Sequence, residues 1–425
     1  MLDHPATMQV LGPSGDEPRS LHIAIVGSGP SGCFTAQMLR KQLPHAAIVV
    51  FDRLPVPYGL LRYGVSPDHQ GTKAITRQFD KMFGSGAVDF VGNVDVGKDV
   101  SLDRMRTLFD IVVLATGLSS DRAVHGVEGD RVYGAGKVMR WFNSHPDELL
   151  FEPLFGDRVA IIGHGNVAVD VLRLLSKDAS AFGGSDLDPL RLGHRPSHIH
   201  VVGRSAASAA KFDSVMIREL ASIDGLAVTV DVLDSLDHQD ARVRAKAEAL
   251  RDLAEGNAVE RPRVRIDFHF GWQPRNLEIS GGAQQLDLIS TDGLSTVRRI
   301  DVDSVVTAVG FAPQNCHTES GLTSTGVISE GLYCVGWLER GSTGGIPDNR
   351  ADAKLLTSRI VADLADGTTS TDRRGLRALE PELHDRTIDF AGWKRIDEFE
   401  SAQQREGRCR IKVPDIATMI EIART

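Results

Sequence analysis

Apolar and polar residues alternate in short blocks near the start of the chain, and the blocks predict strands separated by a helix. Residues 21–26 form a β-branched apolar run typical of a buried parallel strand, and a second such run occupies residues 47–51. A helix is predicted over residues 33–42, after the glycine-rich turn at residues 27–32. Because Asp52 ends the second strand, the order is strand, GxGxxG, helix, strand and acid, which is a dinucleotide-binding unit.

A second unit of the same kind follows further along the chain. Residues 158–162 predict a strand, residues 163–168 read Gly-His-Gly-Asn-Val-Ala, and a helix is predicted over residues 170–176. The next strand, at residues 198–202, ends beside Arg204 instead of an acid. The chain therefore carries two candidate dinucleotide sites.

Three later apolar runs each end in glycine and indicate how the domains are connected. They occupy residues 110–117, 303–310 and 331–336. Such runs suggest that the chain crosses twice between two units. We therefore predict an α/β fold with two Rossmann-like nucleotide-binding domains, of which the first is discontinuous and the second is inserted into it.

The first glycine motif is suited to a pyrophosphate. Gly27 permits the tight turn, Gly29 lets the backbone approach the phosphates, and Gly32 lets the helix pack on the strand. The N-terminus of the helix adds unpaired N–H groups and a partial positive charge. Asp52 can accept hydrogen bonds from ribose hydroxyls and would repel a 2′-phosphate, which favours FAD or NAD over NADP here.

The second glycine motif favours a different nucleotide. Ala168 replaces the third glycine, and Arg204 stands where an acid would read the ribose. A guanidinium at that position suits a 2′-phosphate, so we predict NADP at the second site.

Charge and hydropathy narrow the class of partner. The formal net charge of −9, from 48 basic and 57 acidic side chains, disfavours nucleic acid as a partner. No apolar run approaches the roughly 18 residues of a membrane span. Residues 1–20 carry early acids and Pro/Gly breaks and resemble neither a secretory signal nor a transit peptide, so we expect a flexible arm and a cytoplasmic protein.

The spacing of the four cysteines argues against an electron route through an internal redox dithiol. Cys33, Cys316, Cys334 and Cys409 form no CxxC pair, so we expect neither a metal site nor an internal redox dithiol. Two nucleotide sites without a dithiol imply hydride transfer between a nicotinamide and a bound flavin. The electrons would then leave to an external acceptor, which is an iron-sulfur protein, a small molecule or oxygen.

A sixteen-residue segment gives the chain a family resemblance. Residues 54–69, LPVPYGLLRYGVSPDH, resemble the adrenodoxin reductase family, which includes bacterial ferredoxin-NADP reductases. The likeness extends to residues 92–97, 165–170 and 335–344. The resemblance implies an FAD-dependent NAD(P)H:ferredoxin oxidoreductase that passes single electrons to a ferredoxin or similar iron-sulfur protein.

The same resemblance implies the domain limits. After the arm at residues 1–20, an FAD domain would comprise residues 21–117 and 325–425, and an NAD(P) domain would comprise residues 118–324.

Motif positions also imply the site residues. FAD contacts are expected at Ser31, Asp52, Leu60, Val96, Trp337, Gly344, Gly345 and Ile346. NADP contacts are expected at His164, Gly165, Asn166, Val167, Arg204 and Gly344. His69 and Glu219 match family residues near the nicotinamide, where they would orient it and exchange protons. Asp170 would hold the imidazole of His69, and Trp337 would stack near the ring system and gate access.

Two departures from the family leave open whether the second site prefers NADP(H) or NAD(H). Ser205 replaces the second of two arginines that grip the 2′-phosphate, and Met216 replaces a Glu that contributes to NADP binding. Use of NADP(H), NAD(H) or both is therefore undecided. Two other functions also stay open, the first of them because residues 206–211 depart from the family's pattern. One is a pathway-specific flavoenzyme that reduces an organic substrate or oxygen, and the other is a non-catalytic nucleotide sensor.

Overall fold

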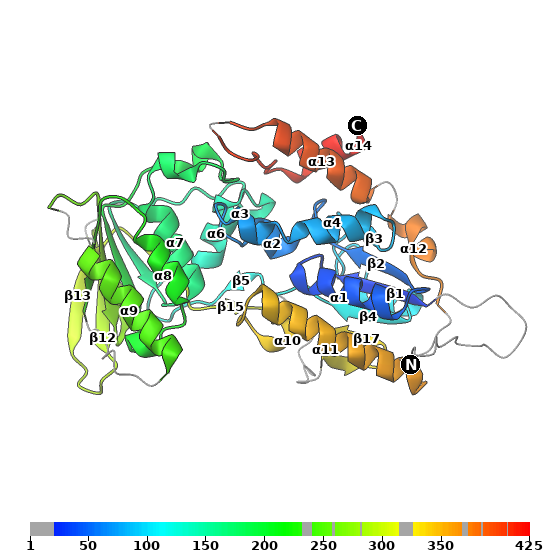
Figure 1. The fold of residues 1–425 in the computed structure, drawn as a ribbon, viewed down its shortest axis with the longest axis horizontal. Coiled ribbons are helices and arrows are strands. Elements are labelled where there is room, and N and C mark those ends of the chain that lie inside the picture. Colours follow the sequence, from blue (N-terminus) through cyan, green and yellow to red (C-terminus); the bar gives the residue numbers. More distant parts are fainter. Residues whose placement is uncertain are drawn as a thin grey trace, which may run out of the picture.

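The computed structural model describes most of the chain after residue 20. The described residues are 21–231, 240–256, 260–280, 283–313, 326–367, 373–383, 386–405 and 407–425. The arm expected at residues 1–20, Cys316 and the expected boundary at residues 324 and 325 lie outside them. The described residues form two α/β units side by side (Figure 1).

The first unit is built on a six-stranded sheet that takes strands from two distant parts of the chain. Its order is β16-β17-β4-β1-β2-β3, and only β16 runs antiparallel to its neighbour. The strands are β1 (His22–Val26), β2 (Ala47–Phe51), β3 (Asp89–Val91), β4 (Ile111–Leu114), β16 (Val327–Ser329) and β17 (Leu332–Cys334). The helices are α1 (Pro30–Gln42), α2 (Gly59–Tyr63), α3 (Gln70–Lys73), α4 (Thr76–Gly84), α5 (Leu102–Leu108), α10 (Trp337–Arg340), α11 (Ile346–Ala365), α12 (Leu376–Leu383), α13 (Phe390–Ala402) and α14 (Ile416–Arg424). The first domain is therefore discontinuous, as the apolar runs that end in glycine predicted.

The second unit has a six-stranded sheet in which all the pairings are parallel, in the order β6-β14-β7-β8-β10-β9. The strands are β6 (Val132–Gly134), β7 (Arg158–Ile162), β8 (His198–Gly203), β9 (Leu226–Val230), β10 (Val264–Phe270) and β14 (Ser304–Thr307). One core packs this sheet against α6 (Ala135–Phe142), α7 (Asn166–Ser176), α8 (Ser214–Leu220) and α9 (Ala241–Gly256). A second core packs its other face against an antiparallel sheet of β11 (Trp272–Ser280), β12 (Ala283–Ser290) and β13 (Val297–Val302). These three antiparallel strands were not predicted from the sequence.

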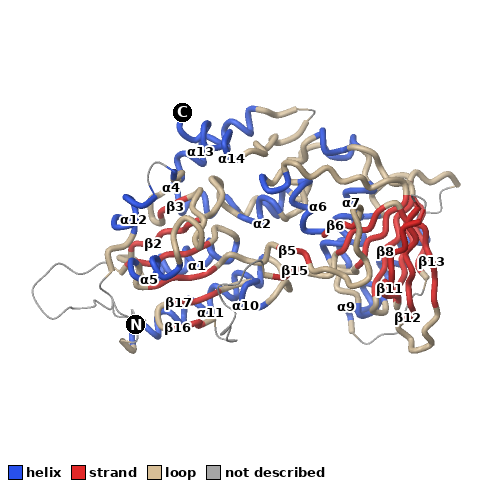
Figure 2. Tube along the Cα trace, turned by 180° about the vertical axis from the view of Figure 1, so that it is seen from behind, coloured by secondary structure: helices blue, strands red, loops and turns tan. Residues whose placement is uncertain are grey.

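The two units are joined by a pair of crossing segments. β5 (Ser120–Asp121) and β15 (Phe311–Ala312) run antiparallel to each other and lie between the two large sheets (Figure 2). Within the described ranges, no helix has the length and hydropathy needed to cross a membrane.

The C-terminal segment ties the two units together through a buried ion cluster. Asp186 of the second unit accepts hydrogen bonds from Lys73 Nζ at 2.9 Å and lies 3.0 Å from Lys412 Nζ. Asn143 Oδ1 accepts from both ammonium groups, at 2.7 and 2.9 Å. Although burial alone would raise the pKa of Asp186, Lys412 and Lys73 lower it to about 2. The cluster therefore favours the ionised carboxylate in the folded protein.

We expect this cluster to make stability depend on acid pH. Because the folded pKa of Asp186 lies below its ordinary value of 3.8, its contribution is present above pH 4 and is lost as the pH falls towards 2. The shift corresponds to about 2 kcal/mol. Urea unfolding at pH 7 and pH 3 should show that Asp186→Asn removes about half of this amount from the pH dependence, because pH 3 lies between the two pKa values. The control Asp130→Asn, at an exposed turn, should retain the wild-type dependence of the unfolding free energy on pH. Equal pH dependence in wild type and Asp186→Asn would contradict the expectation.

Candidate functional site

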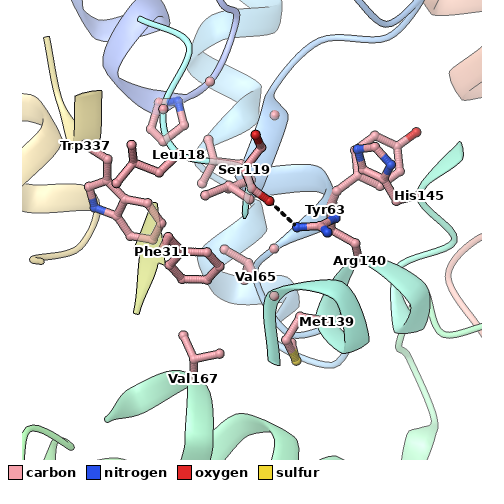
Figure 3. A pocket seen from close by; sticks show the side chains of 18 of the residues that line it. Tyr63, Val65, Leu118, Ser119, Met139, Arg140, His145, Val167, Phe311 and Trp337 are labelled. Atoms are coloured by element: carbon pink, nitrogen blue, oxygen red, sulfur yellow. Dashed lines mark hydrogen bonds between the residues drawn. The ribbon is translucent and has the colours of Figure 1, made fainter. Parts of the chain in front are cut away.

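A cavity of about 1370 Å³ lies where the two units meet and is lined by residues of both glycine motifs. Figure 3 shows part of its wall, with Val167 of the second motif and Trp337 of the first unit. Of the expected site residues, the cavity is lined by Gly27, Gly29, Ser31, Asp52, Leu60, His69, Val96, Asn166, Val167, Asp170, Glu219, Trp337, Gly344, Gly345 and Ile346. Gly32, His164, Gly165 and Arg204 are not among the lining residues. The tertiary structure thus brings together most of a site that the sequence spreads over more than 300 positions.

The first glycine motif has the backbone geometry of a phosphate cradle. Gly27 has φ 108°, and a Cβ there would lie 2.4 Å from the carbonyl oxygen of Ala115. A Cβ on Gly32 would lie 1.9 Å from the carbonyl oxygen of Gly27, so this glycine is needed for packing and not for contact with a ligand. Gly29 has no atom within 4 Å of its Cβ position and caps α1 without a side-chain hydrogen bond. The open face at Gly29 and the uncapped helix end fit a pyrophosphate.

Asp52 stands at the end of β2, where an adenosine ribose is expected. Its Oδ2 accepts from the backbone N–H of Ser28 at 3.0 Å and from the Ser28 hydroxyl, and its Oδ1 accepts from Leu54 N–H at 3.0 Å. Burial raises the pKa of Asp52, while these hydrogen bonds oppose the rise. A carboxylate has about four acceptor positions, so one remains for a ribose hydroxyl. The residues present therefore fit FAD at the first motif.

An aromatic pair closes the cavity where the two units are joined. Trp337 stacks on Phe311, with ring centroids 5.4 Å apart and an interplanar angle of 28° (Figure 3). Trp337 Nε1 is buried and has no hydrogen-bond partner among the described residues. Such an unpaired donor at the cavity wall is suited to an acceptor on a bound group. Phe311 lines the same cavity and was not predicted from the sequence.

His69 is held between two carboxylates from the second unit. His69 Nε2 lies 3.1 Å from Glu219 Oε2, whereas His69 Nδ1 lies 3.7 Å from Asp170 Oδ1. The first distance is a hydrogen bond and the second is only an ion contact. The side chains of His69 and Glu219 are 24% and 39% exposed, so a ligand in the cavity can reach both. Glu219 therefore holds the imidazole more directly than Asp170, to which that role was assigned from the sequence.

Arg173 organises the acids around His69. Its side chain is 2% exposed and pairs with Asp68 and with Asp170, whose Oδ1 lies 2.9 Å from Nη2. Its Nε lies 3.5 Å from Glu219 Oε2. Although burial opposes the effect, Arg173 and Lys177 hold the pKa of Asp68 well below its usual range. Arg173 was not predicted from the sequence, although its position three residues after Asp170 on a helix was a usable signal.

The second glycine motif presents only part of its expected contacts to the cavity. Gly163 has φ 133°, and its Cβ would lie 2.3 Å from the carbonyl oxygen of Ala308. The ring of His164 is buried against Phe270, with centroids 4.3 Å apart, and burial lowers its pKa to about 4. A contact from His164 to NADP would therefore have to come from its backbone. Arg204 is exposed just beyond the end of β8, outside the cavity.

Comparison with known proteins identifies the family. Residues 21–329 match the family model described as pyridine nucleotide-disulphide oxidoreductase. The chain is 56% identical to cindoxin reductase of Citrobacter braakii, over 95% of this chain and 91% of that protein. It is 32% identical to the NADPH-ferredoxin reductase FprA of Mycobacterium leprae, over 94% of this chain and 98% of that protein.

A solved structure agrees with these relatives. FprA of Mycobacterium tuberculosis in complex with NADPH superimposes with a TM-score of 0.88 at 28% identity, covering 96% of this chain and all of that one. The chain belongs to the pyridine nucleotide-disulphide oxidoreductase family and, within it, to the adrenodoxin-reductase-like ferredoxin reductases. The resemblance carried by residues 54–69 is thereby confirmed.

Proposed function

We propose that this protein is an FAD-dependent NAD(P)H:ferredoxin oxidoreductase that takes hydride from a nicotinamide and delivers single electrons to an iron-sulfur protein. The observation that carries the proposal is one cavity that is lined by residues of both nucleotide motifs and by the His69–Glu219 pair. The relatives named cindoxin reductase and NADPH-ferredoxin reductase support electron transfer to a small protein.

The cysteines separate this chain from dithiol enzymes of the same family. The sequence contains no CxxC pair, and the described cysteines Cys33, Cys334 and Cys409 are free thiols outside the cavity lining. Burial raises the pKa of Cys33 well above its usual value, which keeps this thiol protonated and unreactive. Electrons must therefore leave the flavin without a protein disulfide.

The residues around the cavity have distinct tasks in this reaction. FAD, when bound, accepts a hydride and can release its two electrons one at a time. His69 and Glu219 orient the nicotinamide and hold a proton between Nε2 and Oε2. Arg173 fixes the carboxylates on either side of His69, and Trp337 and Phe311 exclude water from the junction of the two units.

We expect FAD, and not FMN, to co-purify with the protein. The cradle at Gly29 and the acid Asp52 serve a pyrophosphate and a second ribose, and FMN has neither group. Mass spectrometry of the chromophore released by heating identifies it. Release of FMN would show that the first motif does not bind a dinucleotide.

One anaerobic titration tests the proposed function. The purified yellow protein should be bleached by NADPH or NADH and should then reduce a ferredoxin. Bleaching followed by electron transfer only to a small molecule or oxygen would favour a pathway-specific flavoenzyme. A colourless protein, or one that neither nucleotide bleaches, would favour a nucleotide sensor.

The domain limits and the compartment belong to the same proposal. An FAD domain at residues 21–117 and 325–425 and an NAD(P) domain at residues 118–324 are supported by the strand composition of the two sheets. Three free thiols among the described residues support a reducing compartment, which we take to be the cytoplasm. Cell fractionation with antibodies to the protein tests this placement.

A further inference from the structure

Two strands of the second unit carry metal-ligand residue types at alternate positions. β8 contributes His198 and His200, and its parallel neighbour β10 contributes Asp267 and His269. His200 and Asp267 are direct partners in the strand register. Because side chains two residues apart point to the same face of a strand, all four lie on one face of the sheet. None of them lines the cavity between the two units.

Three of these side chains converge on one point. The ligand atoms of His198, His200 and Asp267 all lie within 4.8 Å of one another. Asp267 Oδ2 is 2.6 Å from His198 Nε2 and 3.6 Å from His200 Nδ1. Tetrahedral zinc with bonds of about 2.0–2.2 Å requires ligand atoms roughly 3.3 Å apart. Side-chain movements below about 1 Å for these two pairs therefore suffice to admit an ion.

A third histidine, His269, lies next to these three residues. His269 Nε2 lies 3.1 Å from His200 Nδ1, and His269 Nδ1 lies 2.9 Å from Asp231 Oδ2. His269 Nδ1 faces Asp231 Oδ2 and also lies 2.9 Å from Arg298 Nη1, so Nε2 is the ring nitrogen on the side of the cluster, next to His200 Nδ1. Asp231 thus orients His269 in the way that carboxylates orient histidines at metal sites.

We propose that His198, His200 and Asp267 form a site for a divalent transition-metal ion of the zinc class, with His269 as a supporting ligand. Two imidazoles and a carboxylate suit Zn²⁺ and its neighbours, and not Mg²⁺ or Ca²⁺, which take oxygen ligands. The expectation of no metal site rested on the cysteines, and these strand-borne histidines are an independent signal. The ion would bridge β8 and β10 on the face that carries β13.

Two arginines near the site are paired with acids, and Arg265 stands beside His198 in the strand register. Arg298 of β13 pairs with Asp231, and Arg158 pairs with Asp303 at 2.8 Å. The hydroxyl of Thr229 donates to the other oxygen of Asp267, which leaves Oδ2 for the ion. With Arg298 balanced by Asp231, the negative charge of Asp267 is available to the cation.

Zinc titration of the tag-free, metal-stripped holoprotein tests the proposal. Isothermal calorimetry should show one Zn²⁺ per chain for the wild type and for His194→Ala. His194 is a matched control because it forms a histidine–aspartate pair with Asp157, at 2.9 Å, outside the cluster. His198→Ala and Asp267→Asn should each weaken zinc binding by at least about 10-fold.

Co²⁺ provides a second measurement that does not depend on stability. Visible d–d bands of low-symmetry Co²⁺ should appear with the wild type and be lost in both cluster variants. Unchanged flavin content of the partly exposed His198→Ala would show that the variant is folded. No saturable zinc binding by the wild type would overturn the proposal, as would equal affinity in the wild type and both cluster variants.

Discussion

Replacing His69 by alanine, or Glu219 by glutamine, should slow reduction of the bound flavin by NADPH about 10²- to 10⁴-fold and leave flavin content unchanged. His69 Nε2 and Glu219 Oε2 lie 3.1 Å apart at the wall of the cavity that residues of both nucleotide motifs also line. The first change removes the hydrogen bond that fixes Glu219, and the second removes the negative charge beside the imidazole. The FAD cradle lies on different elements, so flavin binding should survive.

Stopped-flow absorbance under anaerobic conditions measures this rate directly. Asp170→Asn should have a smaller effect than Glu219→Gln, because its nearest oxygen is 3.7 Å from His69 Nδ1 and it keeps Arg173 as a partner. Asp224→Asn, an exposed position just after α8, is the matched control and should reduce at the wild-type rate. Wild-type rates in both the His69 and the Glu219 variants would remove this pair from the mechanism.

The parts of the fold that the sequence predicted are those with local determinants. The motif at residues 27–32 needs glycine for a positive φ at Gly27 and for the close approach at Gly32, and both needs are met within one turn. The strands that flank it are continuous apolar runs, which are typical of a sheet covered on both faces. Helices α1 and α7 begin three and four residues earlier than predicted, because each glycine turn passes directly into its helix.

Features that depend on distant contacts were not predicted. Phe311 reaches Trp337 only because β15 pairs with β5 between the units. Arg173 lies within an apolar helix, and its partner Asp68 is more than 100 residues away in sequence. The antiparallel strands β11–β13 expose many polar side chains and show no long apolar run. Only their pairing with one another and their packing on the second sheet define them.

The preference for NADPH over NADH should be weaker than in relatives with paired arginines, with Arg204 responsible for what preference remains. Arg204 is exposed beyond the end of β8, and its backbone carbonyl accepts from the Thr291 hydroxyl at 2.9 Å, which anchors the turn. Ser205 can donate only one neutral hydrogen bond where the family has a second guanidinium. A hydrogen bond to a charged group contributes about 1.5 to 3 kcal/mol, so its loss should reduce discrimination on the order of 10- to 150-fold.

Ratios of kcat/KM for NADPH and NADH test this expectation in three variants. Arg204→Ala should nearly abolish the preference, and Ser205→Arg should raise it, since both positions follow the same strand. Lys211 is exposed, and its backbone N–H donates to the carbonyl of His164 at 2.9 Å, so it is an alternative cation beside the second glycine motif. Lys211→Met should therefore change the preference less than Arg204→Ala. A strong wild-type preference for NADPH that persists in Arg204→Ala and disappears in Lys211→Met would show that the lysine, and not the arginine, reads the 2′-phosphate.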